Sequence, residues 1–423
     1  MKQRVRQIIN DMRRQPLISG VSFIATVMSV FLFMVVAILQ RLQTIPFAPE
    51  SCRDRLLLGK YFHICGIGDN EDSSGGLSSN LAKEIYGGLE GVEHTSYFDP
   101  EIFTQNVGGT AETNFEAYCR GVDAEFFKIF DHPLISGRYF TPEEVEAGLP
   151  LAVISERTAR RAFAATECEG KTLLVDHKKY TVAGVVKDNS FLATTACGDV
   201  FTVKLPDVAS DDRYAYWGNT AVALLVKEGV SFDDIRRQVK ARYAVLDTRL
   251  KTEGRKAVYH ESPFDQATIA SGIDGSNVTP DSSSTTKTYY FLYAILLVVP
   301  ALNLSSLLHS RMQKRVNEIG VRRAFGCTRR RVIADILGEN FLVTLAGGFV
   351  GVALGIVFAM TYSGLYENMD TYGSGLTPAL SSVVNWGTIA IAVGACFILN
   401  LISASVPAWQ ASRLNPVEAI NTK

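Results

Sequence analysis

The sequence lacks the short motifs that usually reveal an active site. It contains no CxxC, HExxH or GxSxG pattern, so thiol-redox, zinc-protease and serine-hydrolase sites built on those motifs are excluded. Gly170, Lys171 and Thr172 resemble the end of a phosphate-binding loop, but Ala165 stands where such a loop has its first glycine. We therefore expect no nucleotide site and no catalytic centre in this chain.

Histidine and cysteine are sparse, and their spacing does not predict a metal site. His63 and Cys65 form the closest pair, and residues two apart also share one face of a strand, so we interpret them as strand alternation. Of the seven cysteines, five fall in the long central segment, and an odd number leaves at least one free or paired between chains. They are small buried residues or include a disulfide whose partners the sequence does not identify: Cys52, Cys65, Cys119, Cys168 and Cys197.

A surplus of charge is also absent. The chain has 42 Lys and Arg against 43 Asp and Glu, so its net charge of -1 gives no reason to expect a nucleic-acid partner. The apolar residues gather in four uncharged runs, each close to the roughly 20 residues that cross a bilayer. These runs are Leu17–Leu39, Thr288–Leu308, Phe341–Tyr362 and Trp386–Ala408. Because their cores hold no Asp, Glu, Lys, Arg or His, we expect no polar conduit or proton relay through them.

The first apolar run follows a basic head, so a cleaved signal peptide is the alternative to a retained membrane anchor. The head contains Lys2, Arg4, Arg6, Arg13 and Arg14. The run is longer than the apolar core of a signal peptide, and no small-x-small cleavage site follows it. We therefore expect the helix to be retained.

The distribution of basic residues orients the membrane helices. His309–Arg331 holds many Arg and Lys against the single acid Glu318, which places it in the cytoplasm, whereas Ser363–Asn385 holds none and lies outside. The predicted fold is a membrane α-helical protein with four transmembrane helices and a large α/β extracytoplasmic domain between the first two. The predicted segments are 1–16 (cytoplasmic, amphipathic), 17–40, 287–309, 338–362 and 386–409 (membrane), 41–286 (external), 310–337 (inner), 363–385 (outer loop) and 410–423 (inner tail).

The external domain is predicted to contain two strand–helix–strand units with a β-rich segment between them. The outer elements are a strand in Arg55–Cys65, a helix in Ser78–Gly88, a strand in Ala221–Lys227, a helix capped by Ser231 that buries Ile235, Val239, Tyr243, Leu246 and Leu250, and a strand in Lys256–His260. The middle elements are a strand at Leu151–Ser155, a helix at Glu156–Phe163 and a hairpin of Thr172–Asp176 and Tyr180–Lys187 turned by residues 177–179. Residues 271–286 are predicted to be a flexible hinge because Ser, Thr, Gly and Asp dominate them.

The inner basic segment has an amphipathic pattern. Apolar residues recur at helical spacing in two sets, Met312, Val316 and Ile319, then Val321 and Phe325. The pattern predicts one helix that breaks near Gly326 and a second helix that starts after Thr328 as its N-cap. An apolar face with basic flanks is typical of a helix that docks on a protein partner. It is equally typical of an interfacial loop whose arginines bind anionic lipid.

Small residues form a ladder in the third apolar run. Gly347, Gly351 and Gly355 recur every four residues, which lets another helix approach closely. The partner is another helix of the same chain or a helix of a second protomer, and the sequence leaves both alternatives open.

Four stretches are similar to motifs of one known family. Residues 317–326, NEIGVRRAFG, resemble its EIG-x-RRA-x-G stretch after the second span, and residues 407–420 resemble its PA…L-x-P-x-EAL tail. Gly137–Thr141 and Tyr180–Asp188 are similar to elements of its external domain. Because these stretches occur in the right order over essentially the whole chain, the sequence resembles the MacB/FtsX-type ABC transporter permeases, the mechanotransmission or type VII superfamily.

The resemblance implies a non-catalytic subunit that couples ATP hydrolysis by a separate cytoplasmic ABC ATPase to conformational change outside the membrane. ATP and Mg would be bound by that partner, with no cofactor in this chain. The implied coupling residues are Glu318, Ile319, Gly320, Arg322, Arg323, Ala324, Phe325 and Gly326, and the C-terminal motif is Pro407, Leu414, Pro416, Glu418 and Ala419. The implied external parts are Porter-like (41–102 and 202–270) and Sabre-like (103–201).

The resemblance also implies an inner-membrane, multi-pass protein with both termini cytoplasmic and the large domain periplasmic. Its implied partners are membrane lipid, a second permease subunit, identical or related, and a periplasmic adaptor or outer-membrane protein. The first expected function is extrusion of a peptide, drug or lipoprotein. The alternatives are a signalling module that activates a periplasmic hydrolase or sensor without moving cargo, and a membrane anchor without an ATPase.

Overall fold

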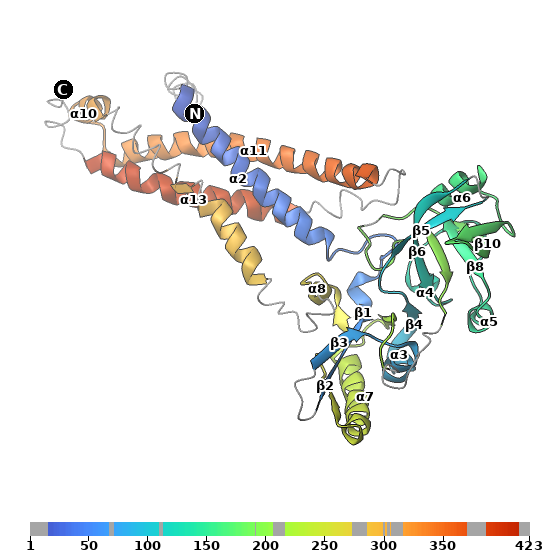
Figure 1. Cartoon of the computed structure of the whole chain (residues 1–423). Coiled ribbons are helices and arrows are strands. Elements are labelled where there is room, and N and C mark those ends of the chain that lie inside the picture. Colours follow the sequence, from blue (N-terminus) through green and yellow to red (C-terminus); the bar gives the residue numbers. More distant parts are fainter. Residues whose placement is uncertain are drawn as a thin grey trace. The chain divides into compact units, whose positions relative to one another are not determined.

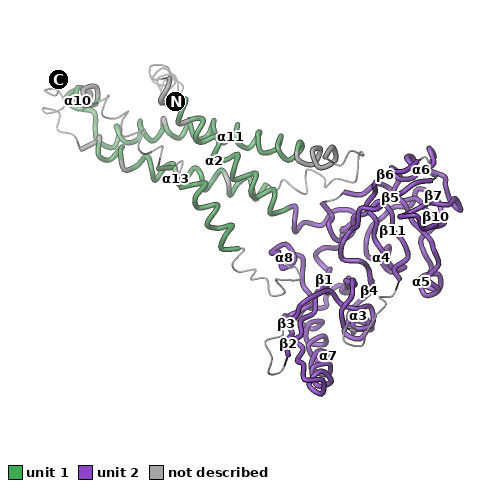
Figure 2. The backbone as a smooth tube through the Cα atoms, viewed as in Figure 1, with its two compact units in different colours: residues 1–41, 283–362, 383–423 green, residues 42–282, 363–382 purple. Residues whose placement is uncertain are grey.

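The chain divides into two compact units, which Figure 2 colours separately. The computed structural model describes residues 16–66, 72–109, 113–190, 192–205, 216–272, 286–298, 301–302, 305, 316–369 and 386–413. Unit 1 comprises residues 1–41, 283–362 and 383–423 and contains the long apolar helices. Unit 2 comprises residues 42–282 and 363–382 and contains every described strand.

Unit 1 is built from helices whose apolar length fits a membrane. In the described residues, three stretches are long and apolar enough to span it: Phe23–Leu42, Arg329–Thr361 and Ile389–Gln410. They belong to α2 (Pro16–Leu42), α11 (Arg329–Met369) and α13 (Trp386–Arg413), which are labelled in Figure 1. These helices contain the first, third and fourth predicted spans.

The second predicted membrane segment, 287–309, lies only partly within the described residues. Residues 286–298 are helical and contact α2. The Ser29 hydroxyl donates a hydrogen bond to the Leu296 carbonyl at 2.9 Å, and the Tyr293 hydroxyl lies 2.8 Å from Gln40 Oε1. This part of the segment is therefore a helix that packs beside the first span.

Helix α11 begins earlier than the predicted third membrane segment, which starts at residue 338. The backbone N–H groups of Arg331 and Val332 donate to the Thr328 carbonyl, so the first turn follows Thr328 directly. The restart after Thr328 is confirmed. The helix starts before the apolar run because arginine is a good helix former, so the basic residues that precede the run are helical too. Residues 329–337 of the predicted inner segment are thus part of the same helix as the span.

The glycine ladder of α11 packs against α2 within the same chain. A Cβ atom added at Gly347 would lie 3.0 Å from Thr26 Cβ, and one added at Gly351 would lie 2.8 Å from Val30 Cβ. At Gly355 the added atom would lie 2.7 Å from the Cβ atom of Met34. Both helices repeat every four residues, so their backbones approach along the whole ladder. The structure therefore uses the ladder inside one chain, and the alternative of packing between protomers is wrong for this contact.

The outer part of unit 2 is assembled from two distant stretches of the chain. Its elements are η1 (Arg53–Arg55), β1 (Leu56–Gly59), β2 (Tyr61–Gly66), β3 (Asp72–Gly76), α3 (Ser79–Tyr86) and β4 (Val92–Phe98), then β12 (Ala221–Val226), α7 (Phe232–Thr252), β13 (Arg255–Ala257), β14 (Phe264–Asp265) and α8 (Gln266–Ile269). Within the described residues the strands form a sheet of order β14-β1-β12-β4 and a smaller one of order β13-β2-β3.

The two predicted helices of this part are confirmed, with their caps. Ser78 accepts a hydrogen bond from the Leu81 backbone in α3, and Ser231 accepts one from the Asp233 backbone in α7. The residues predicted to face the core of α7 are all buried. The single strand predicted in Arg55–Cys65 is wrong, because the chain leaves one sheet and enters another at Lys60.

The segment between these stretches forms a closed ring of strands. Its elements are β5 (Phe103–Gly108), β6 (Phe115–Val122), α4 (Phe126–Ile129), β7 (Leu134–Gly137), α5 (Pro142–Glu146), β8 (Leu151–Ser155), α6 (Glu156–Phe163), β9 (Thr172–Val175), β10 (Lys178–Val186) and β11 (Val200–Val203). The order is β7-β10-β8-β11-β6-β5-β9, and β9 also pairs with β10, so the described strands close into a barrel to which β7 is added.

The predictions for this barrel are largely confirmed. Strand β8 and helix α6 have the predicted bounds. The β9–β10 hairpin is also present, but its turn consists of Asp176 and His177, both with positive φ, which is typical of a two-residue hairpin turn. Lys178 and Lys179, which were predicted to belong to the turn, pair with Val175 and Leu174 in the ladder.

Two hydrophobic cores share the central strands of unit 2. Val222 and Leu224 of β12 face the core lined by α3 and α7, whereas Ala223 and Leu225 face a second core. That second core also contains Phe201 of the barrel. Strand β12 is consequently buried along its whole length, and the sheet and the barrel form one packed body.

All seven cysteines lie in the described residues, and none of them forms a disulfide within the chain. A disulfide between two of the five external cysteines of one chain is therefore wrong, and pairing between chains stays a prediction. Several predicted segments lie outside the described residues: 1–15 of the amphipathic head, 273–285 of the hinge, 370–385 of the outer loop and 414–423 of the tail.

Candidate functional site

The candidate site is the basic elbow, which we define as residues 316–331. Helix α10 (Val316–Ala324) ends just before Gly326, whose φ of 89° lies in the left-handed region. The Phe325 and Gly326 N–H groups donate to carbonyls of the last turn of α10, and α11 starts after Thr328. A glycine at this position is the usual way to end a helix and turn the chain. The predicted break is therefore confirmed.

One side of α10 is anchored to the helices behind it. Ile319 is 8% exposed and packs in a cluster with Val332 and Ile336 of α11 and Ala408 of α13. Gly320, the next residue, is also buried. Ile319 thus fixes the orientation of α10, and its side chain does not face outward.

The other side of the elbow is exposed. Phe325 is 89% exposed and Val321 is 44% exposed, and Ala324 lies at the surface between them. The arginines at 329, 330 and 331 are exposed at the start of α11. Ile319, Ala324 and Phe325 were predicted together as coupling residues. The structure separates them, because α10 packs on α11 through Ile319 and presents Val321 and Phe325 outward.

The remaining predicted site residues are distributed as follows. Arg323 is half-buried, and Glu318 and Arg322 lie in α10, although their side chains are outside the described set. Pro407 is buried inside α13 beside Ala408. Leu414, Pro416, Glu418 and Ala419 lie outside the described residues.

A buried polar contact behind the elbow was missed by the sequence analysis. The Asn340 side chain of α11 donates to the Asn400 carbonyl of α13 at 3.2 Å, and the Asn400 side chain donates to Thr344 Oγ1 at 3.3 Å. Both asparagines are 5% exposed. Interhelical hydrogen bonds of this kind join helices in apolar surroundings. An asparagine within each of the predicted membrane segments 338–362 and 386–409 was the signal that could have revealed the contact.

His63, which the sequence paired only with Cys65, contacts a second histidine that is far away in the chain. His63 Nδ1 lies 2.5 Å from His260 Nε2, and Cys65 Sγ lies 3.6 Å from His63 Nε2. The two neighbours therefore contact opposite nitrogens of the His63 ring and do not converge on one point. In the part of the chain that the structure describes, no group of three or more His, Cys, Asp or Glu side chains could hold a metal ion.

Comparison with known families agrees with this architecture. The model of the MacB-like periplasmic core domain matches residues 17–242, more than half of the chain. The chain belongs to the MacB-like family. A second model, the FtsX-like permease C-terminal domain, matches residues 290–416, which include the elbow. As a MacB- and FtsX-like ABC transporter permease component, the chain is a membrane protein with a periplasmic domain.

Curated relatives of this MacB-like chain carry related names. It is 23% identical over 336 residues to the uncharacterized ABC transporter permease YknZ of Bacillus subtilis, covering 79% of this chain and 77% of YknZ. It is 24% identical over 307 residues to the macrolide export ATP-binding/permease protein MacB of Bdellovibrio bacteriovorus, covering 73% of this chain and 44% of that protein. The chain thus spans less than half the length of this MacB relative.

Solved structures include similar domains. The extracellular domain of the YknZ transporter from Gram-positive bacteria covers 47% of this chain at 16% identity, with all of that domain matched and a TM-score of 0.32. The periplasmic region of MacB from Actinobacillus actinomycetemcomitans covers 51% of this chain at 15% identity, with 90% of that region matched and a TM-score of 0.34.

Proposed function

We propose that this permease couples ATP hydrolysis by a separate cytoplasmic ABC ATPase to a conformational change in unit 2, and that this change drives extrusion of a peptide, drug or lipoprotein. The elbow and both termini would lie in the cytoplasm, with segments 17–40, 287–309, 338–362 and 386–409 in the inner membrane. Unit 2 would lie in the periplasm. The working complex would contain the ATPase and a second permease subunit.

The observation that carries the proposal is the division of the elbow into an anchored side and an exposed side. Ile319 is buried in the chain's own core, whereas Phe325 is 89% exposed beside exposed arginines. Exposed aromatic and arginine side chains are the residue types that contribute most at protein interfaces. Because α10 is held by α11 and α13, a push on Phe325 would be carried into two membrane helices.

A separate ATPase is favoured by the sequence and by the names of the relatives. The chain has no complete phosphate-binding loop, since Ala165 replaces the first glycine of the partial motif. The YknZ relative, most of whose length is matched, is named as a permease, whereas the longer MacB relative is named as an ATP-binding and permease protein. ATP and Mg would accordingly be bound by the partner chain.

The test is capture of the ATPase by the full-length chain in nanodiscs, with the Phe325→Ala variant. Loss of an aromatic side chain at the centre of an interface typically costs about 2 kcal/mol, so we expect binding to weaken about 30-fold. The matched control is Val245→Ala, because Val245 is an exposed apolar residue (70%) on α7 in unit 2. Equal capture by the Phe325→Ala variant and the wild type would contradict the coupling role.

The same preparation tests the lipid alternative for the elbow. If Phe325→Ala leaves ATPase capture unchanged but weakens binding to vesicles that contain anionic phospholipid, the elbow is an interfacial lipid-binding loop. The output is tested by adding candidate cargo. Stimulated ATP hydrolysis supports extrusion, whereas activation of a co-purified periplasmic enzyme without such stimulation supports the signalling alternative.

A further inference from the structure

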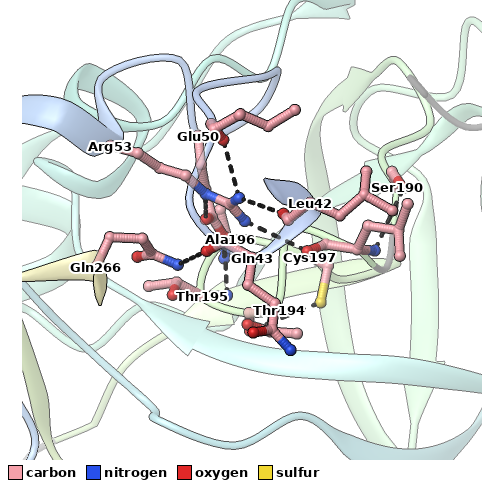
Figure 3. A network of polar contacts seen from close by, with 12 residues as sticks. Leu42, Gln43, Glu50, Arg53, Ser190, Thr194, Thr195, Ala196, Cys197 and Gln266 are labelled. Atoms are coloured by element: carbon pink, nitrogen blue, oxygen red, sulfur yellow. Dashed lines mark hydrogen bonds and ion pairs between the residues drawn. The ribbon is translucent and has the colours of Figure 1, made fainter. Parts of the chain in front are cut away.

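The chain that leaves the first span is held inside unit 2 by a fully buried ion pair. Glu50 and Arg53 are 1% and 2% exposed, and Arg53 Nε lies 2.6 Å from Glu50 Oε2. The pair lies on the linker between α2 and β1, which is shown in Figure 3. A buried ion pair is stable only when the remaining polar atoms of both partners are satisfied.

Arg53 fills its remaining donors with backbone carbonyls. Its Nη1 donates to the Leu42 and Ile45 carbonyls, each at 3.0 Å, and its Nη2 donates to the Leu192 carbonyl at 3.3 Å. Leu42 is the last residue of α2. One guanidinium therefore joins the end of α2 to the loop between β10 and β11, a geometry that the planar fork of arginine allows and a lysine ammonium does not reproduce.

Glu50 holds the same loop from the other side of the pair. Its Oε1 accepts hydrogen bonds from the backbone N–H groups of Thr195 and Ala196, at 2.8 and 2.9 Å. Figure 3 shows Glu50 and Arg53 both directed at this part of the loop. We call Glu50, Arg53 and the five backbone groups that they bind the clamp.

The clamped loop is also fixed to the barrel. Arg120 of β6, which is 1% exposed, donates from Nη2 to the Thr194 carbonyl at 3.0 Å and from Nη1 to the Thr195 carbonyl. The loop thus lies between the clamp and a barrel strand. A displacement of the linker that keeps these bonds intact must move residues 192–196 and, with them, Arg120.

A hydrogen bond also joins the start of residues 42–282 to helix α8 near their end. The Gln266 side chain at the start of α8 donates to the Gln43 carbonyl at 2.9 Å. Gln43 follows the first span, and α8 precedes the second membrane segment in the sequence. The exit from one span and the approach to the next are therefore joined by one hydrogen bond beside the clamp.

We propose that Glu50 and Arg53 are positioning residues that carry displacement of the chain leaving the first span to residues 192–196 and, through Arg120, to barrel strand β6. This inference rests on the proposed function, because the displacement would originate at the ATPase. Its structural part, that the clamp holds the loop, stands without a partner and can be tested on the chain alone.

The first measurement is hydrogen exchange of the full-length chain in nanodiscs. In Arg53→Lys and Glu50→Gln variants, we expect the amides of Thr195 and Ala196 to exchange about 10-fold faster than in the wild type, because opening of the loop becomes easier. Unchanged protection of α7 shows that unit 2 is folded. If Arg53→Lys fails to fold, Glu50→Gln, which keeps the size of the side chain, is measured alone. The control is Arg138→Lys, because Arg138 also pairs with a carboxylate, that of Glu144, but outside the loop between β10 and β11. Wild-type exchange at residues 194–196 in the clamp variants overturns the proposal.

The second measurement adds the ATPase and compares ADP with ATP and vanadate. In the wild type we expect a nucleotide-dependent change in exchange within β6. In Arg53→Lys that change should be lost while the rate of ATP hydrolysis stays within about two-fold, which a purely structural role would not produce. A clamp variant that transmits the change like the wild type overturns the relay. No change in the wild type overturns the proposed function, and the relay with it, while the first measurement still decides whether the clamp holds the loop.

Discussion

The elbow of unit 1 and the clamp of unit 2 both rely on arginine, but they place it in opposite environments. At the elbow, the arginines at 329–331 are exposed, and Phe325 beside them is 89% exposed. At the clamp, Arg53 is 2% exposed and binds Glu50 and three carbonyls. Hydrated groups can exchange one partner for another at little cost, whereas buried charges must stay paired. The exposed arginines suit a surface that binds a second protein. The buried arginine suits a contact that holds two segments of the chain in fixed positions.

The largest effect on the stability of unit 2 is expected when one charge of the clamp is removed. Arg53→Met leaves Glu50 buried without its partner, so we expect unit 2 to lose about 3–5 kcal/mol of stability. The measurement is chemical unfolding followed by the fluorescence of Trp217, in a background where Trp386 and Trp409 are replaced by Phe. The double variant Glu50→Gln with Arg53→Met should recover part of the loss, because no unpaired charge remains. A single variant as stable as the wild type would contradict the buried pair.

Acid is expected to lower the stability of unit 2 by a smaller amount, through the buried side chain of His132. His132 is 2% exposed, and its ring lies against those of Phe126 and Phe201. Burial lowers the pKa of His132 to about 3, and the nearby Arg120 charge acts in the same direction. The unfolded chain therefore binds a proton that the folded chain excludes, so stability is complete above about pH 6.5 and falls toward pH 3.

The expected slope for His132 is about 1.4 kcal/mol per pH unit within that window. Between pH 6.5 and 4.5, unit 2 should lose about 2–3 kcal/mol through this group, by the same linkage. His132→Phe should flatten this part of the profile, because it keeps the aromatic contacts with Phe126 and Phe201 and cannot bind a proton. Equal slopes for the wild type and the variant would show that other groups govern the acid response.

The turn of the elbow should respond more weakly. Gly326→Ala places a side chain at a φ of 89°, which costs roughly 1–2 kcal/mol. We expect amide exchange in residues 321–325 to rise about 5- to 30-fold, with unit 2 unaffected. Gly338→Ala is the matched control, since it lies inside α11 with no atom within 4 Å of the added Cβ. That control should keep or increase helix stability. Equal behaviour of the two variants would argue against the left-handed turn.

The smallest effect on stability is expected at the exposed surface of the elbow. Phe325→Ala and Arg330→Ala should each change the unfolding free energy by less than about 0.5 kcal/mol, because surface substitutions rarely do more. The same variants should still weaken ATPase capture. Thermal unfolding of the chain without its partner provides the measurement. A large loss of stability would mean that these residues support the fold, and the contrast between elbow and clamp would disappear.

Elements that depend on near neighbours were predictable from the sequence. Helix α7 matches its predicted cap and buried face because the repeat of apolar residues every three to four positions is a local property. The restart of the chain at Thr328 was predictable for the same reason. The strand predicted in Arg55–Cys65 was wrong because the chain changes sheets at Lys60, and which sheet receives a strand depends on distant partners.

The candidate site was predictable in position but not in orientation. The break at Gly326 and the basic flank could be located from residue types alone. Which apolar residues face outward could not, since Ile319 is buried by α11 and α13 and Phe325 is not. The clamp gave no sequence signal at all: Glu50 binds backbone groups of Thr195 and Ala196, about 145 residues away.

The sequence by itself determined where the long apolar helices α2, α11 and α13 lie, where the elbow bends and which face of α7 is apolar, because these properties arise from residues within a few positions of one another. Only the tertiary structure decided that the glycine ladder packs on α2, that the barrel closes through β9, and that Arg53 joins the end of α2 to a distant loop. These contacts join stretches that are remote in the chain. Their pairing depends on which surfaces the whole fold brings together, and no local pattern encodes that choice.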